Sequence, residues 1–208
     1  MKHLLMRPIL FITALIIGLG CSPKLPPPSP PMPDNYVNIS DCSFYNDYSA
    51  KERLSRKPFG QSEKVELVSF DGEFESRIDS FVSKLPRGEI PKKNSKIDRS
   101  QLKEIITLST SQLDSLTNIF FNYDYGRTES GIGIISESKT GCYEPRHALL
   151  FFKKKTDTQP FVYFEICLEC REVKTFPRAY ELGNFCRGKY NLLRDFFRQT
   201  GIKYGLER

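Results

Sequence analysis

The sequence predicts an α+β protein: a single domain in which a β-sheet packs against about three helices, after a disordered proline-rich stalk. In the first half of the chain, two β-forming segments are each followed by apolar residues at helical spacing. The second half is rich in β-formers and contains a hairpin, and an amphipathic helical segment precedes the C-terminus. These observations favour one sheet with helices packed on it.

Residues 1–20 are typical of a lipoprotein signal peptide. Lys2 and Arg7 give it a positive start, and the apolar run from Ile9 to Leu19 is too short for a stable membrane span. The run ends at Gly20-Cys21, which resembles the bacterial lipobox, where the cysteine is diacylated and becomes the new N-terminus. We therefore predict lipidation at Cys21, with a freely secreted protein as the alternative.

Residues 21–40 form the predicted stalk, and residues 41–208 the predicted domain. Dense proline between Ser22 and Asn35 favours extended polyproline II, which has no core of its own. Serine directly after the lipidated cysteine resembles an outer-membrane address. We expect an outer-membrane lipoprotein of the cell envelope, facing the periplasm or the cell surface.

The charge pattern argues against nucleic acid as a partner. The formal net charge is +6, but the basic residues are spread along the chain, apart from short runs near Lys92 and at 153–155. Such short runs are typical of solvated loops. The expected partners are instead the membrane, through the predicted anchor at Cys21, and a protein of the cell envelope.

The first half of the domain contains two strand–helix pairs. Val65–Phe70 is a predicted strand that ends at the turn pair Asp71-Gly72. Its helix has an apolar stripe and stops at Pro86, before a polar loop at 86–100; the stripe consists of Phe74, Ile78, Phe81 and Leu85.

The second pair begins with a strand at Leu102–Leu108. Ser109 and Gln112 then match a capping box, because the serine side chain can accept a first-turn amide while the glutamine reaches back. The helix that follows ends between Asn122 and Gly126; its apolar face consists of Leu113, Leu116, Ile119 and Phe120.

The second half begins with strands at 132–136, 146–152 and 161–167. The last two flank a polar loop, so we predict an antiparallel hairpin whose partners have numbers that sum to about 312. This register places His147 near Glu165 and Cys142 near Cys170. A final helix runs from about Asn184 to Gly201, with a buried stripe of Cys186, Tyr190, Leu193 and Phe197.

In the predicted fold, the cysteines and the histidine of the second half lie close together. The end of the hairpin and the start of the last helix meet, which gathers Cys142, His147, Cys167, Cys170 and Cys186. Five cysteines follow Cys21, an odd number, and Cys42 beside the stalk is the expected outsider.

Three interpretations of this cluster remain open. Structural disulfides are the default in an exported chain, and we expect Cys142–Cys170 or Cys167–Cys186 links. We expect no cofactor, but the residue types also suit a zinc or copper site. Finally, Cys167 and Cys170 would suit a thiol–disulfide oxidoreductase, although no helix is predicted to begin at Cys170.

The only histidine after the signal peptide is His147. It is a candidate general base, but no nucleophile motif accompanies it, and a hydrogen-bonded structural role is the more common one. We therefore favour a structural or binding domain over an enzyme.

Three blocks of the sequence resemble a family of small uncharacterised lipoproteins from Gram-negative bacteria. They are CYEPRH at 142–147, EICLEC at 165–170 and FCRGKYNLLRDFFRQTGIKYG at 185–205. The family pattern reads CYxPRH, ICxEC and FCxxKYxLLxxFFxxxGIxYG, and Leu168 departs from the phenylalanine common there. The resemblance covers roughly the last 70 residues. It implies an exported, lipid-anchored domain and no particular activity.

Overall fold

The computed structural model describes residues 37–38, 42–71, 89–126, 133–134, 143–180 and 182–206. The chain divides into two compact units, Met1–Pro33 and Asp34–Arg208, and all of the described residues belong to the second. The predicted signal peptide, Cys21, most of the stalk, the helix at 74–85 and Cys142 lie outside the described residues. None of the helices in the described part is long and apolar enough to cross a membrane.

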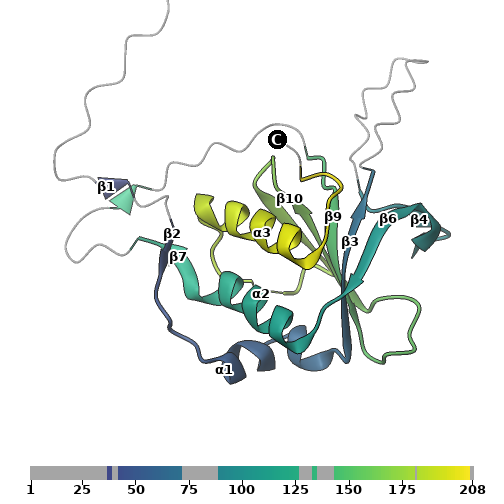
Figure 1. Ribbon diagram of the computed structural model, residues 1–208, viewed down its shortest axis with the longest axis horizontal. Coiled ribbons are helices and arrows are strands. Elements are labelled where there is room, and N and C mark those ends of the chain that lie inside the picture. The colour runs from purple at the N-terminus through teal and green to yellow at the C-terminus, as the bar shows by residue number, and fades with distance from the viewer. Residues whose placement is uncertain are drawn as a thin grey trace, which may run out of the picture. The chain divides into compact units, whose positions relative to one another are not determined.

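The centre of the domain is a five-stranded antiparallel sheet with the order β11-β10-β9-β3-β6 (Figure 1). The predicted α+β class is confirmed, and the predicted strands in the described residues lie close to their expected positions. The strands are β3 (Lys64–Phe70), β6 (Leu102–Thr107), β9 (His147–Phe152), β10 (Val162–Cys167) and β11 (Glu172–Phe176).

Short strand pairs and turns lie outside this sheet. The parallel pair is β1 (Val37–Asn38) with β8 (Gly133–Ile134), and the antiparallel pairs are β2 (Cys42–Phe44) with β7 (Tyr123–Tyr125) and β4 (Lys92–Lys93) with β5 (Lys96–Ile97). Two 3₁₀ turns, η1 (Phe59–Gln61) and η2 (Arg99–Gln101), precede β3 and β6.

The described helices are α1 (Ala50–Ser55), α2 (Thr110–Asn122) and α3 (Arg187–Thr200). The predicted capping box of α2 is confirmed, since Ser109 Oγ accepts the Gln112 amide while the Gln112 side chain accepts the Ser109 amide. The final helix starts a few residues after the predicted Asn184, and it ends at Gly201 as predicted. Helix α1 was not predicted, because it is too short for a periodic stripe.

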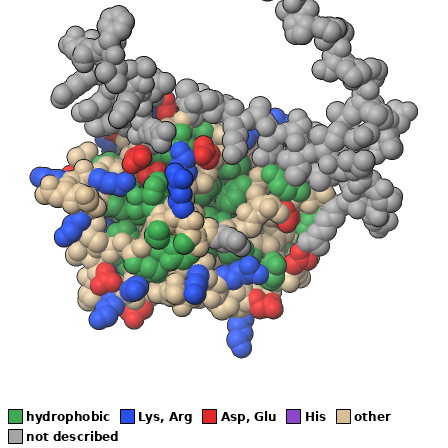
Figure 2. Space-filling view, turned by 180° about the vertical axis from the view of Figure 1, so that it is seen from behind, with side chains coloured by type: hydrophobic (Ala, Val, Ile, Leu, Met, Phe, Trp, Pro, Cys, Tyr) green, Lys and Arg blue, Asp and Glu red, His purple; other side chains and the backbone are tan. Residues whose placement is uncertain are grey.

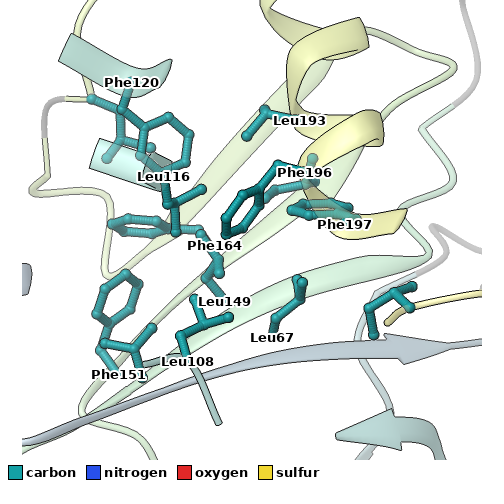
Figure 3. Close-up of a cluster of buried hydrophobic side chains, with 14 of the residues drawn as sticks. Leu67, Leu108, Leu116, Phe120, Leu149, Phe151, Phe164, Leu193, Phe196 and Phe197 are labelled. Carbon is teal, nitrogen blue, oxygen red and sulfur yellow. The ribbon is translucent and has the colours of Figure 1, made fainter. Parts of the chain in front are cut away.

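Helices α2 and α3 cover one face of the sheet (Figure 1). On this face, buried residues of both helices meet those of β3, β9 and β10 (Figure 3). The predicted stripe of α3 is confirmed, since Cys186, Tyr190, Leu193 and Phe197 are all buried.

The opposite face has its own smaller core, formed by Val68, Phe70, Ile90, Ile97, Ala148, Leu150 and Phe152. Seen from behind, hydrophobic side chains gather towards the middle, with Lys and Arg side chains around them (Figure 2).

The hairpin register confirms the predicted pairing within one residue. Ile166 lies opposite His147, and Glu165 lies opposite Ala148. Because side chains alternate between faces, this single step puts His147 on the helix-covered face and Glu165 on the other. The expected approach of the His147 and Glu165 side chains is therefore wrong.

Candidate functional site

A cavity of about 530 Å³ lies beside β11, the edge strand of the sheet. Val173 and Thr175 of β11 form one wall, and the segment that leads into α3 contributes Tyr180 and Leu182. This volume lies in the range of small-molecule pockets. The sequence patterns did not predict the cavity, because its walls come from distant parts of the chain.

Part of the cavity wall is aromatic. The Tyr125 hydroxyl donates a hydrogen bond of 3.0 Å to the Phe185 carbonyl. The Phe185 ring lies 5.6 Å from the ring of Tyr190 and 5.8 Å from that of Phe120, measured between centroids. Aromatic side chains held in this way supply contact area at little entropic cost on binding.

The rim of the cavity carries opposite charges. Arg171 and Glu172 both line it, and they lie at the junction between the cysteine motif and β11. Arg171 is exposed and has a positive φ of 53°, which the turn at 168–171 requires. The conformation of the cysteine motif thus positions a cation at the cavity.

A buried lysine lies behind the aromatic wall, with its ammonium 5.0 Å from the centre of the Phe185 ring. Lys189 of α3 donates a hydrogen bond of 2.9 Å to the Phe120 carbonyl and another to the Asn184 carbonyl. Burial lowers the pKa of Lys189 to about 8. The ammonium satisfies a carbonyl in the last turn of α2, where the helix dipole favours a cation. In the sequence, only the position of Lys189 next to the predicted stripe on α3 indicated that this lysine is buried.

Cys42 and Cys186 form a disulfide with a Cα–Cα distance of 5.3 Å. The prediction that Cys42 stays outside the cysteine network is wrong, and so is a Cys167–Cys186 link. Pairing of β2 with β7, which follows α2 directly, carries Cys42 to the start of α3. A Cβ at Gly188 would lie 3.3 Å from Cys42 Sγ, so glycine leaves room for the bond. In the chain-entropy model such a long loop contributes about 5 kcal/mol.

Cys167 and Cys170 bond to each other within the motif. The expected Cys142–Cys170 link is therefore wrong. Strand β10 ends at Cys167, and the turn at 168–171 brings Cys170 back beside it. The chain continues as the extended strand β11, which confirms that no helix begins at Cys170.

Backbone amides point at both sulfurs of this bond. The Cys170 amide lies 3.1 Å from Cys167 Sγ, and the Glu144 amide lies 3.3 Å from Cys170 Sγ. The exposed fractions of Cys167 and Cys170 are only 1% and 5%. After reduction, these amides would stabilise a thiolate.

His147 has a structural environment. Its Nε2 lies 2.9 Å from the Tyr204 carbonyl, and its ring packs on Phe197. Burial lowers the pKa of His147 to about 4, so the ring is neutral at pH 7 and Nε2–H is the donor to that carbonyl. The basic nitrogen is then Nδ1, and the exposed fraction of His147 is only 1%, so the ring is buried away from solvent.

Glu165 lies on the other face of the sheet, in a polar cluster that the sequence did not predict. Its carboxylate accepts hydrogen bonds from the Ile90 amide (2.9 Å) and the Tyr143 hydroxyl (3.2 Å). Burial raises the pKa of Glu165. The Lys174 ammonium lies 3.2 Å from the centre of the Tyr143 ring, as a cation–π contact. The cluster attaches two loops to the sheet.

The predicted disulfide pairings within the cysteine cluster are wrong, and Cys142 lies outside the described residues. The four described cysteines form two disulfides, and His147 is bonded to a backbone carbonyl. Among the described residues, no group of three His, Cys, Asp or Glu side chains could hold a metal ion. The burial of Cys186 is confirmed, but its partner differs from the expected one.

Comparison of the chain with protein-family models, curated proteins and solved structures found no match.

The buried neutral histidine predicts a loss of stability in mild acid. Its folded pKa of about 4 lies below the ordinary value of 6.5, so the unfolded chain binds the proton first as the pH falls. The free energy of unfolding should therefore fall between pH 6.5 and 4, by up to roughly 3 kcal/mol from this group. Urea unfolding at pH 7 and pH 4.5 should show a smaller fall for His147→Gln. An equal fall in both proteins would contradict this account.

Proposed function

We propose that the protein is a lipid-anchored component of the cell envelope whose domain binds a partner through the cavity beside β11. The observation that carries the proposal is the cavity itself, which combines an aromatic wall with a rim of opposite charges, Arg171 and Glu172. Aromatic residues with a few polar groups are typical of binding pockets. The two disulfides support an oxidising compartment, as the signal peptide predicts.

The position of Cys42 supports a role as an anchored domain. Cys42 follows the predicted stalk closely in the sequence and is covalently joined to the start of α3. Tension on the stalk would pass through this bond into a helix of the core. The short pairing of β2 with β7 would then not have to resist this tension alone.

A second function, thiol–disulfide exchange, is supported by the amides that point at Cys167 and Cys170. In this reaction, a thiolate of a partner dithiol attacks one sulfur, and the mixed disulfide is resolved by the second partner thiol. The partner becomes a disulfide, while Cys167 and Cys170 gain two electrons and two protons as thiols. The burial of both sulfurs makes binding the better-supported function.

Cys21→Ser tests the anchor. We expect the variant to lose incorporation of labelled palmitate and to leave the membrane fraction, because no acyl chains remain. Cys42→Ser is the matched control and should stay with the membrane. A Cys21→Ser protein that is cleaved normally and stays membrane-bound would refute the lipidated anchor.

Photocrosslinking in cells tests the cavity as a binding site. We expect a photoreactive phenylalanine analogue in place of Thr175 to form discrete adducts with a partner, because this position lines the cavity. The control position is Ile105, an exposed residue on the opposite edge strand of the same sheet. Identical adducts at both positions, or none at Thr175, would contradict a binding cavity.

Treatment with thioredoxin separates the two functions. Because both sulfurs are buried, we expect Cys167–Cys170 to resist reduction in the folded protein, as measured by alkylation and mass spectrometry. The Cys42–Cys186 bond is an internal control. Rapid reduction of Cys167–Cys170 while Cys42–Cys186 stays intact would instead support thiol–disulfide exchange.

A further inference from the structure

Strand β11 is an edge strand, and the phase of the sheet determines which of its backbone groups point outwards. The Phe70 amide donates to the Arg146 carbonyl, and the Leu108 amide donates to the Val65 carbonyl. Even-numbered residues of β3 therefore bond to β9, and odd-numbered ones bond to β6. In an antiparallel ladder, successive residues direct their backbone groups to opposite sides of the strand.

The same alternation continues across the sheet. Residues 147, 149 and 151 of β9 bond towards β10, where their partners are 166, 164 and 162. Residues 163, 165 and 167 of β10 then bond towards β11, where their partners are 176, 174 and 172. The amides and carbonyls of Val173 and Thr175 consequently point away from the sheet. In the described part of the chain, no backbone group outside β10 bonds to β11.

The free edge and the cavity form one surface. Val173 and Thr175 present their backbone groups at the edge, and their side chains line the cavity. A ligand that pairs with this edge therefore brings side chains of one face to the cavity. An extended peptide has this combination of features, because its backbone continues the ladder while alternate side chains enter pockets.

We propose that an extended segment of another envelope protein adds to β11 as a sixth strand and inserts one large side chain into the cavity. The proposal rests on the proposed function and specifies its ligand class. An exposed arginine flanks each end of β11, Arg171 before the strand and Arg178 after it. The complementary segment has a short apolar centre with an acidic residue on each side.

Charge also argues against a second copy of this chain as the occupant. Full antiparallel overlap of two β11 strands places Lys174 opposite the same lysine of the second copy. Like charges directly opposite each other destabilise a strand pair, and a lysine in an edge strand is a common device against self-association. The net charge of +6 opposes self-pairing as well.

The test uses the mature full chain and a labelled peptide with the sequence Glu-Thr-Val-Tyr-Val-Thr-Glu, acetylated and amidated. Two further peptides are N-methylated at alternate amides, each at a different set. Only one of these sets faces β11, so only one of the two peptides is unable to pair with the strand. Fluorescence anisotropy should show binding of the parent peptide. One N-methylated peptide should lose at least about tenfold in affinity while the other keeps it, because only one face of the peptide backbone meets the edge.

Variants of the protein test the same backbone hydrogen bonds by changing β11 instead of the peptide. Thr175→Pro removes an outward amide and should weaken binding of the parent peptide by about tenfold or more. Ile105→Pro is the matched control, because it removes an outward amide from β6, the opposite edge strand, and this variant should bind the peptide normally. Thermal unfolding checks that both variants are folded, and Val173→Pro replaces Thr175→Pro if the latter is not.

Three outcomes would overturn strand addition: equal binding of both N-methylated peptides, no binding of the parent, or sedimentation as a dimer that pairs through β11. Crosslinked adducts at Thr175 would still support the cavity as a binding site in each case. Failure of the strand model and failure of the binding function are thus distinguishable.

Discussion

The alternation of backbone hydrogen bonds across the five-stranded sheet determines which backbone groups of β11 face outwards. The bond from the Phe70 amide to the Arg146 carbonyl sets the phase of β9, and the register carries that phase through β10 to β11. It leaves Val173 and Thr175 with outward backbone groups beside the cavity. The register also separates His147 from Glu165. Ile166 lies opposite His147 and shares its face, whereas the next residue, Glu165, points to the other face.

Covalent and polar contacts hold the cavity walls around that edge. The Cys42–Cys186 bond fixes the start of α3, and the Lys189 ammonium joins α3 to the last turn of α2. The Cys167–Cys170 bond closes the turn that positions Arg171. Each disulfide thus supports a different wall of the same cavity.

The sequence predicted elements with local signals and missed the long-range contacts. The capping box at Ser109 and the stripe ending at Phe197 were readable because their residues lie within a few turns of one another. The Cys42–Cys186 pairing was not, because it depends on the pairing of β2 with β7. A register error of one residue was enough to place His147 on the wrong face. The cavity could not be predicted, since its walls meet only in the folded chain.

The most direct test of the free edge is native-state hydrogen exchange of the β11 amides, measured residue by residue by NMR. We expect fast exchange at Val173 and Thr175 and slow exchange at Lys174 and Phe176, which bond towards β10. The outward and inward amides alternate along one strand, so local opening of the strand affects both equally. A difference between their exchange rates therefore reports only which amides are hydrogen-bonded. Equal protection of all four amides would contradict a free edge at β11.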